Sequence, residues 1–376
     1  MCQPMVSAAW LSADGRGSAM KPEQGAPELA GPSAGRPTGA GAGDSCRTRS
    51  DARPRQPASM TGRPVRFGAI INPVAGCGAG ARIADELAGF LRGAGAEVSI
   101  DFSRTLEHAH QLATQVCRGD RIVLAVGGDG LAGCVAHAVV ANGGVLGLVP
   151  AGRGNDFARQ LGVPDAPLEV ARILLSGVVR VVDVLEAGGR TVLGSVYVGV
   201  DSTANAIVNT RPRVPRWVVY QYAAVRSLLT FRPVGYRIIL DGQDQAEDGF
   251  TVVVANSGYY AAGVHIVPTA EVDDGLLDVL LIKDIARWRL IAALREIYSG
   301  THLRRPEMEI RRGREVVLTA NRPIPVYADG EPLTDMPVRV RVLPGALRVL
   351  SPPEVESVTS VGHPPHRPAQ HRQDTL

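Results

Sequence analysis

Residues 125–135 read AVGGDGLAGCV, in which Gly127, Gly128 and Gly130 surround Asp129 between an apolar run and an alanine-rich one. The apolar side looks like the end of a buried strand, and the other side looks like the start of a helix. Glycines at such a junction either make a tight turn or leave backbone N–H groups bare enough to approach an anion. Which of these two roles they have decides the fold and the function.

The sequence around this stretch divides into two patterned regions. From about residue 65 to 177, apolar runs such as RIVLAV and GVLGLV alternate with stretches of helical period such as ARIADELAGFLRG. This alternation predicts a Rossmann-like α/β domain with a parallel sheet over residues 63–178, and the glycine-rich connections within it favour a nucleotide-binding domain. Over residues 179–351, β-branched runs between turn signals predict a mostly antiparallel, β-sandwich-like domain, with helices near 215–230 and 286–299.

Both ends of the sequence differ in composition from this patterned middle. Residues 1–62 and 352–376 are rich in polar residues, Gly and Pro and lack apolar periodicity, so we expect both tails to be disordered. Met60 lies just before the first patterned strand. Translation is therefore expected to start at either Met1 or Met60.

Composition limits the class of protein and its surroundings. With 376 residues, 45% of them hydrophobic, the chain can bury a large core. The net charge of +3 is too small and dispersed to argue for a nucleic-acid partner, although it is compatible with an anionic membrane surface. Five cysteines without paired or metal-ligand spacing favour a reducing, cytoplasmic location. No apolar stretch reaches the ~20 residues that span a bilayer, so any membrane contact would be peripheral.

Glycine-rich connections follow three of the predicted parallel strands. They read INPVAGCGAG at 71–80, AVGGDGLAG at 125–133 and VPAGRGNDFAR at 149–159. Such loops leave a parallel sheet at its carboxyl edge, where a polyphosphate could bind to bare backbone and helix N-termini. For any one loop a simple tight turn is the commoner explanation, and Asp156 could be only a helix cap, but three loops together favour a nucleotide site.

The order of these loops resembles that of a known family. Asn72-Pro73, Gly127-Gly128-Asp129-Gly130 and Pro150-Ala151-Gly152 with Gly154 to Arg159 look like the catalytic domain of bacterial diacylglycerol kinases and related lipid kinases, including sphingosine kinases. Later segments match in order and approximate spacing over about residues 65–350, namely Gly199-Val200-Asp201, Asn256 to Tyr259, PTAEVDDGLLD at 268–278 and Tyr327 to Glu331.

The resemblance implies roles for individual residues. Asp129 would organise Mg²⁺-bound waters near the ATP phosphates, Asp329 or Glu331 would be the general base, and a structural metal would be held by Glu271, Asp274 and the backbone of Leu276. The ATP site would be lined by Asn72, Pro73, Gly76, Ser103, Gly127, Gly128, Asp129, Gly130, Gly152, Arg153, Gly154, Asn155 and Asp156.

Three positions depart from the family pattern. Leu131 and Gly133 remove a hydroxyl and an amide from the expected nucleotide site, and Arg153 replaces a threonine. A side-chain hydrogen bond to a charged phosphate contributes ~1.5–3 kcal/mol, so losing one would weaken ATP binding roughly tenfold to a hundredfold. Arg153 would offset this loss if it made a bidentate phosphate contact, or it could point to solvent.

Asp-Gly pairs and arginine-rich segments complete the candidate features. Asp241-Gly242, Asp274-Gly275 and Asp329-Gly330 all look like hairpin turns, so spacing alone selects no base among them. Residues 211–232 combine Arg211, Arg213, Arg216, Arg226 and Arg232 with Trp217, Tyr220, Tyr222 and Phe231. This segment is either a helix at a membrane interface or a largely buried helix that closes the second domain. Trp288 is expected to pack inside the protein.

Together these features predict an ATP- and Mg²⁺-dependent lipid kinase at the membrane surface, with diacylglycerol as acceptor and phosphatidate as product. A sphingoid base is an alternative acceptor. A soluble acceptor is another alternative, because NAD kinases also carry a Gly-Gly-Asp-Gly loop. A third alternative is a noncatalytic family member that binds lipid or nucleotide, suggested by Leu131, Gly133 and Arg153. The sequence is compatible with a homodimer.

Overall fold

The computed structural model describes residues 64–209, 216–297 and 299–353. Met60, Arg211, Arg213 and the tails expected to be disordered, apart from residues 352–353, lie outside this part of the chain. Of the helices in the described part, none is long and apolar enough to cross a membrane.

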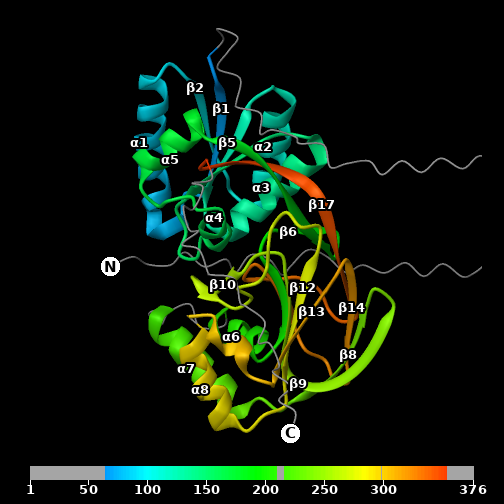
Figure 1. The fold of residues 1–376 in the computed structure, drawn as a ribbon. Coiled ribbons are helices and arrows are strands. Elements are labelled where there is room, and N and C mark those ends of the chain that lie inside the picture. The colour runs from blue at the N-terminus through cyan, green and yellow to red at the C-terminus, as the bar shows by residue number, and fades with distance from the viewer. Residues whose placement is uncertain (1–63, 210–215, 298, 354–376) are drawn as a thin grey trace, which may run out of the picture.

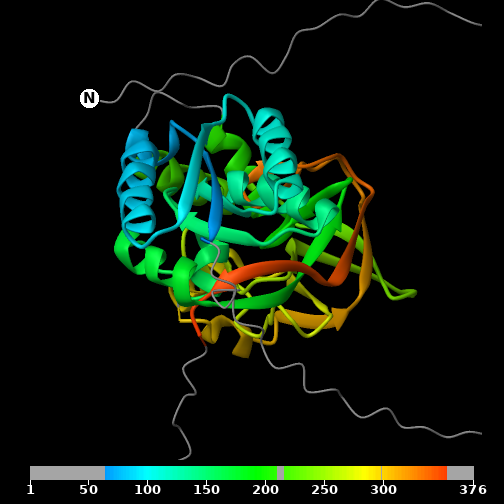
Figure 2. The same cartoon turned by 90° about the horizontal axis from the view of Figure 1, so that it is seen from above.

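The first half is an α/β unit around a parallel sheet with strand order β4-β3-β1-β2. Helices α1 and α5 pack together on one face of the sheet, and α2 and α3 pack together on the other (Figures 1 and 2). Because both faces are covered, β1, β3 and β4 are almost entirely buried. The elements are β1 (Arg66–Ile71), η2 (Ala75–Gly78), α1 (Ala79–Gly93), β2 (Glu97–Phe102), α2 (Leu106–Arg118), β3 (Ile122–Gly127), α3 (Asp129–Asn142), β4 (Leu146–Pro150), α4 (Asp156–Gln160) and α5 (Pro167–Ser176).

The second half is mostly antiparallel and carries three helices at its far end (Figure 1). Its elements are β5 (Val178–Ala187), β6 (Arg190–Val192), β7 (Ser195–Gly199), α6 (Val200–Asn209), α7 (Arg216–Thr230), β8 (Val234–Leu240), β9 (Gln243–Ala255), β10 (Tyr259–Tyr260), β11 (Val264–His265), β12 (Leu277–Lys283), α8 (Arg287–Ile297), η3 (Thr301–Arg304), β13 (Met308–Gly313), β14 (Glu315–Ala320), β15 (Val326–Ala328), β16 (Glu331–Pro332) and β17 (Val338–Ser351). The predicted fold class, a parallel α/β domain followed by an antiparallel β-sandwich, is confirmed.

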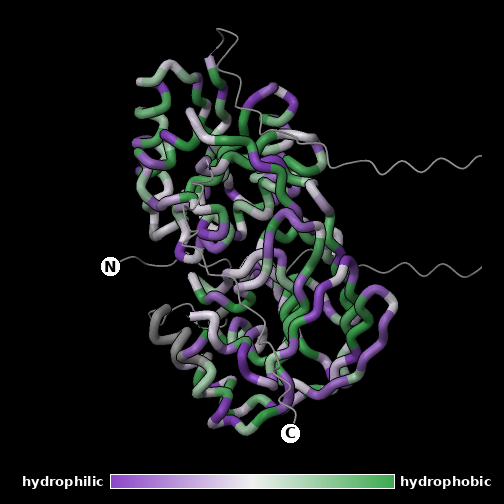
Figure 3. The backbone as a smooth tube through the Cα atoms, viewed as in Figure 1, coloured by the Kyte–Doolittle hydropathy of each residue, from purple (hydrophilic) through white to green (hydrophobic). Residues whose placement is uncertain are grey.

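Two long strands join the halves. β17 pairs with β14 and β5, and its last residues run parallel to β4, so the sheet is continuous. Along β5 the side chains pass from one hydrophobic core to the other: Val182 and Val184 belong to the first core, and Leu185 and Ala187 to the second. Figure 3 shows hydrophobic residues along the strands of both halves. The return of β17 to the first half was not anticipated from the sequence pattern.

Two local predictions need correction. Helix α6 lies where only β-structure was expected, and it is stabilised by packing against α7, where Ala204 and Ile207 contact Ala223. The Asp274-Gly275 pair is not a hairpin turn, because it connects a loop to β12 rather than two paired strands. The other two Asp-Gly pairs do form tight hairpins, β8–β9 and β15–β16, with positive φ at both residues.

Candidate active site

The three glycine-rich loops meet at the carboxyl edge of the parallel sheet. A Cβ atom added at Gly152 would lie 2.3 Å from the Cα atom of Gly128, and one at Gly76 would lie 2.6 Å from the carbonyl oxygen of Ala151. Side chains at these positions would therefore collide with backbone of the neighbouring loop. The bare backbone first serves to bring the loops after β1, β3 and β4 into contact, which leaves their N–H groups at one place.

Polar side chains in these loops, and Ser103 after β2, hold the loops in shape. The Asn72 Oδ1 atom accepts the N–H of Val74, and the Ser103 hydroxyl donates to the carbonyl of Ile71. Asn155 closes the third loop, because its side chain both accepts the N–H of Gly152 and donates to the Gly152 carbonyl. Pro73 and Arg153 are exposed at the loop surfaces.

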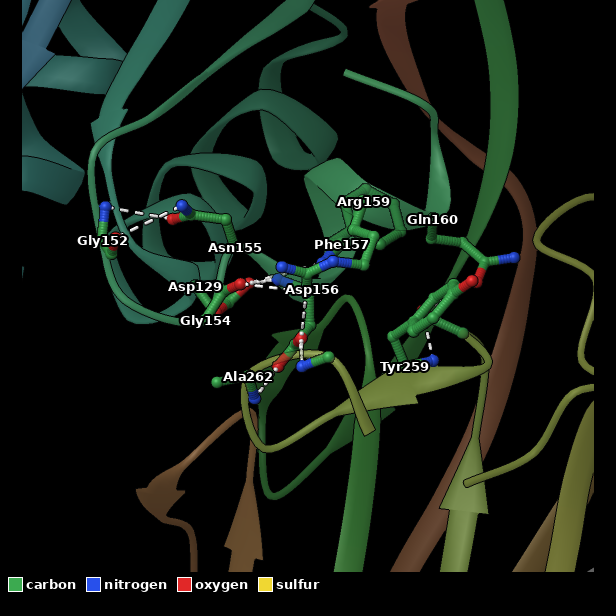
Figure 4. Close-up of polar contacts among 12 residues, drawn as sticks. Asp129, Gly152, Gly154, Asn155, Asp156, Phe157, Arg159, Gln160, Tyr259 and Ala262 are labelled. Carbon is green, nitrogen blue, oxygen red and sulfur yellow. Dashed lines mark hydrogen bonds and ion pairs between the residues drawn. The ribbon is translucent and has the colours of Figure 1, made fainter. Parts of the chain in front are cut away.

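Asp129 is the first residue of α3, but it caps another helix. Its Oδ1 atom accepts the N–H of Asp156 at 2.7 Å and that of Phe157 at 3.4 Å, which are donors at the start of α4 (Figure 4). Burial raises the pKa of this carboxyl group, and the charge of Asp156 raises it further against the opposing effect of the N–H groups. Its other oxygen, Oδ2, lies 2.5 Å from where a Cβ atom of Gly154 would stand. Glycine at 154 therefore keeps Oδ2 uncovered.

Asp156 connects the two halves of the protein. Its Oδ2 atom accepts the N–H of Ala262, and its Oδ1 atom accepts the N–H of Gly263 and contacts Arg159 at 2.8 Å (Figure 4). Next to it, the Gln160 Oε1 atom accepts the N–H of Gly258. Both oxygens of Asp156 are thus used to attach α4 to the β10–β11 turn. These contacts use three of the about four acceptor positions of the carboxylate, so one position on Oδ2 remains for a further contact.

Asp329 is held in the β15–β16 turn with φ of 47°. Its Oδ2 atom accepts the N–H of Leu193 at 2.9 Å, and its Oδ1 atom accepts those of Gly194 and Ser195 at 3.0 and 2.9 Å. Burial raises the pKa of Asp329 to about 6 despite these three bonds, and the charge of Asp129 also raises it. The turn that carries Asp329 is therefore fixed on the strand connection before β7.

The β15–β16 turn faces the start of α3. The Asp329 Oδ2 atom lies 3.9 Å from where a Cβ atom of Gly133 would stand, and Glu331 Oε1 lies 3.6 Å from that position at Gly130. The fold thus brings together Asp129, Asp329 and Glu331, which the sequence singled out from distant segments. The absence of a side chain at Gly133 leaves space between α3 and Asp329.

The residues expected to hold a structural metal are arranged differently. Asp274 Oδ1 accepts the N–H of Leu276 at 2.9 Å, and its Oδ2 atom lies 3.3 Å from Arg312, while Glu271 is exposed. Within the described part of the chain, no group of three or more His, Cys, Asp or Glu side chains could hold a metal ion. The metal role of Glu271, Asp274 and Leu276 stays a prediction.

Two buried polar residues support the site: Asp183, which the sequence analysis missed, and Asn256, which it named only as part of a matching segment. Asp183 is 2% exposed and accepts the N–H groups of Gly275 and Gly345, each at 2.7 Å. The Asn256 side chain donates to the carbonyls of Asp183 and Leu193, and the N–H of Leu193 in turn binds Asp329. An aspartate in the middle of the apolar run VVDVL was the available sequence signal for Asp183.

Leu131 does not face the loops but the core of the first half. It is 3% exposed, belongs to the first hydrophobic core, and covers Gly127, whose added Cβ atom would lie 2.8 Å from the leucine side chain. The departure from the family pattern at this position therefore contributes to packing.

We expect Leu131→Thr to lower the free energy of unfolding by about 1–3 kcal/mol, because it leaves a cavity and buries a hydroxyl group. Nucleotide affinity should stay unchanged, since the side chain is directed into the core. Denaturant unfolding and ATP titration of the two proteins measure both quantities. Tighter ATP binding at unchanged stability would contradict this placement.

Two halves around one such site are the architecture of a kinase. Comparison with known proteins agrees with this class. The family profile described as "Diacylglycerol kinase catalytic domain" matches residues 66–187, and the one described as "YegS C-terminal NAD kinase beta sandwich-like domain" matches residues 194–351. A diacylglycerol kinase of Mycobacterium tuberculosis is 30% identical over 292 residues, which are 76% of this chain and 94% of that protein. The chain belongs to the family of diacylglycerol kinases and YegS-like lipid kinases.

More distant relatives extend the comparison. The "Probable lipid kinase YegS-like" protein of Chromohalobacter salexigens is 25% identical over 279 residues, covering 68% of this chain and 89% of its own. The crystal structure of a diacylglycerol kinase from Bacillus anthracis superimposes with a TM-score of 0.59 at 21% identity, over 77% of this chain and 97% of that one. At this identity the superposition supports the fold alone.

Proposed function

We propose that the protein is an ATP- and Mg²⁺-dependent lipid kinase that transfers the γ-phosphoryl group to the hydroxyl of diacylglycerol and forms phosphatidate. The observation that carries the proposal is that Asp129, the first residue of α3, lies next to the joined glycine loops, and that the Asp329–Glu331 turn faces the same first turn of α3. Phosphoryl transfer depends mainly on positioning and charge neutralisation, and these elements can supply both.

The glycine loops fit the phosphates of ATP. Gly76 and Gly152 allow no side chain, a Cβ atom at Gly128 would lie only 3.3 Å from the Cα atom of Gly152, and the N-terminus of α3 begins beside them. Backbone N–H groups and the helix dipole would bind the phosphate oxygens there, with exposed Arg153 at the edge of the same loops.

Asp129 fits a site for Mg²⁺. Magnesium keeps several waters and commonly binds through one or two carboxylates and the substrate phosphates, so the Oδ2 atom of Asp129 is a sufficient protein ligand. When bound there, the ion would neutralise phosphate charge. Asp129 would also keep α4 capped through Oδ1, so one side chain serves both the fold and the chemistry.

Asp329 is the better candidate for the general base. Its two oxygens offer about four acceptor positions, and three N–H groups use three of them, which leaves one for the acceptor hydroxyl. With a pKa of about 6, Asp329 would be mainly ionised at neutral pH and still able to accept a proton. Glu331 in the same turn is the alternative base.

The acceptor and the surroundings are inferred from relatives and chemistry. A diacylglycerol kinase with 30% identity favours diacylglycerol over a sphingoid base or a soluble acceptor. A kinase for such an apolar lipid would work at the membrane surface as a peripheral cytoplasmic protein. A homodimer stays a prediction from the sequence.

The direct test uses residues 60–376 with labelled ATP, Mg²⁺ and mixed micelles that contain diacylglycerol or sphingosine, followed by separation of the products. We expect label in phosphatidate and much less in phosphorylated sphingosine. Label only in the sphingosine product would reassign the acceptor. ATP binding by folded protein without any labelled lipid would favour the noncatalytic alternative.

A further inference from the structure

Helix α7 presents an apolar face to solvent. Tyr222, Val225 and Leu229 are 40%, 55% and 52% exposed and follow one another at helical spacing, while Ala223 and Leu228 are buried on the opposite side. The exposed face of a helix on a globular protein is normally charged or polar. An outward row of large apolar side chains therefore indicates a surface that contacts something else.

Helix α8 extends this face. The Arg287 guanidinium donates to the carbonyls of Leu229 at 2.6 Å and Phe231 at 3.4 Å, which fixes the first turn of α8 against the end of α7 (Figure 1). The next residue, Trp288, is 71% exposed. The expectation that Trp288 packs inside the protein is wrong, because α8 buries Leu290, Ala293 and Ile297 instead. We define the α7–α8 face as Tyr222, Val225, Leu229 and Trp288.

The charges around the α7–α8 face are positive. Arg226, Arg232 and Arg287 are exposed beside it, and Arg226 donates to the hydroxyl of Tyr222. The sequence of α7 contains no Asp or Glu, and the single acidic residue of α8, Glu296, pairs with Arg305 at 2.7 Å. An apolar face with a basic rim matches the apolar boundary and the anionic headgroups of a bilayer.

A second copy of the chain fits this face less well. In a twofold dimer the same patch would meet itself, so the arginines of the two rims would face each other.

We propose that the α7–α8 face docks on an anionic lipid bilayer, with Val225, Leu229 and Trp288 inserted among the headgroups and the arginines on lipid phosphates. This inference rests on the proposed lipid kinase function, because it supplies the surface from which the acceptor would come. Helix α6 connects the face to the site: it packs on α7, its Asn205 donates to the Tyr197 hydroxyl, and Tyr197 stacks on Tyr327, two residues before Asp329.

The first experiment measures vesicle binding of the full chain. We compare the wild type, a Leu229→Glu/Trp288→Glu variant and a matched control, Phe90→Glu/Leu168→Glu, which changes two exposed apolar residues of the first half. Phosphatidylcholine vesicles with and without phosphatidylglycerol are the probes. Wild type and control should sediment with the anionic vesicles, and the Leu229/Trp288 variant should bind them at least about tenfold more weakly. Equal binding by all three proteins overturns the proposal.

The second experiment separates docking from catalysis. Diacylglycerol is offered either in anionic vesicles or as monodisperse dioctanoylglycerol. The Leu229/Trp288 variant should lose roughly tenfold or more of its activity on vesicles and none on the monodisperse acceptor. Equal loss of activity on both acceptors overturns the docking proposal. A difference in oligomeric state between the wild type and the Leu229/Trp288 variant in the absence of vesicles also overturns it. If the wild type phosphorylates no lipid, the proposed function fails, whereas vesicle binding still decides the docking proposal.

Discussion

Asp129→Asn is expected to lower kcat by at least about a thousandfold while the protein stays folded. Asparagine keeps a carbonyl oxygen that can accept the N–H groups of Asp156 and Phe157, so α4 remains capped. It removes the negative charge that the Oδ2 atom would offer to Mg²⁺. Turnover with labelled ATP and thermal unfolding of the same preparations measure the two effects separately.

Two further variants control this experiment. Asp129→Ala removes the cap as well as the charge, so it should lose activity and also about 1 kcal/mol or more of stability. Asp120→Asn changes an exposed aspartate before β3 and should behave like the wild type. Near-normal turnover of a folded Asp129→Asn protein would restrict Asp129 to its structural role as a helix cap.

Asp329→Asn is expected to reduce kcat by about a hundredfold to ten thousandfold, the usual contribution of a general base. Only the ionised carboxylate can accept the proton, and burial raises the pKa of Asp329 to about 6. Wild-type activity should therefore fall about tenfold for each pH unit below that pKa. A pH profile of kcat between 5 and about 8 measures this acidic limb.

Two comparisons assign the limb to a residue. The pKa of Asp201 is also raised to about 6 by burial, so Asp201→Asn must keep the limb if Asp329 produces it. Glu331→Gln should reduce kcat by less than about tenfold if Asp329 is the base. If Glu331 is the base instead, Glu331→Gln should show the larger loss of kcat. A wild-type profile that stays flat to pH 5 would exclude Asp329 as a titrating base.

Much of the fold could be predicted because local patterns specify local structure. Strand-helix alternation around AVGGDGLAG predicted the parallel sheet, and β-branched runs between turns predicted the antiparallel half. The glycine loops were predictable too, since bare backbone is required wherever loops such as those at Gly128 and Gly152 touch. The pairing of β17 with β4 was not predictable, because no local sequence feature of a strand specifies a pairing strand so far away in the sequence.

The candidate site divides in the same way. The sequence was enough to show which residues could bear charge and where the backbone had to be bare, because these are properties of single residues and their neighbours. The folded structure was needed to show that Asp129 caps α4, that Asp156 holds the β10–β11 turn, and that Trp288 is exposed. Each of these outcomes depends on which distant group stands opposite a side chain, and packing alone fixes that.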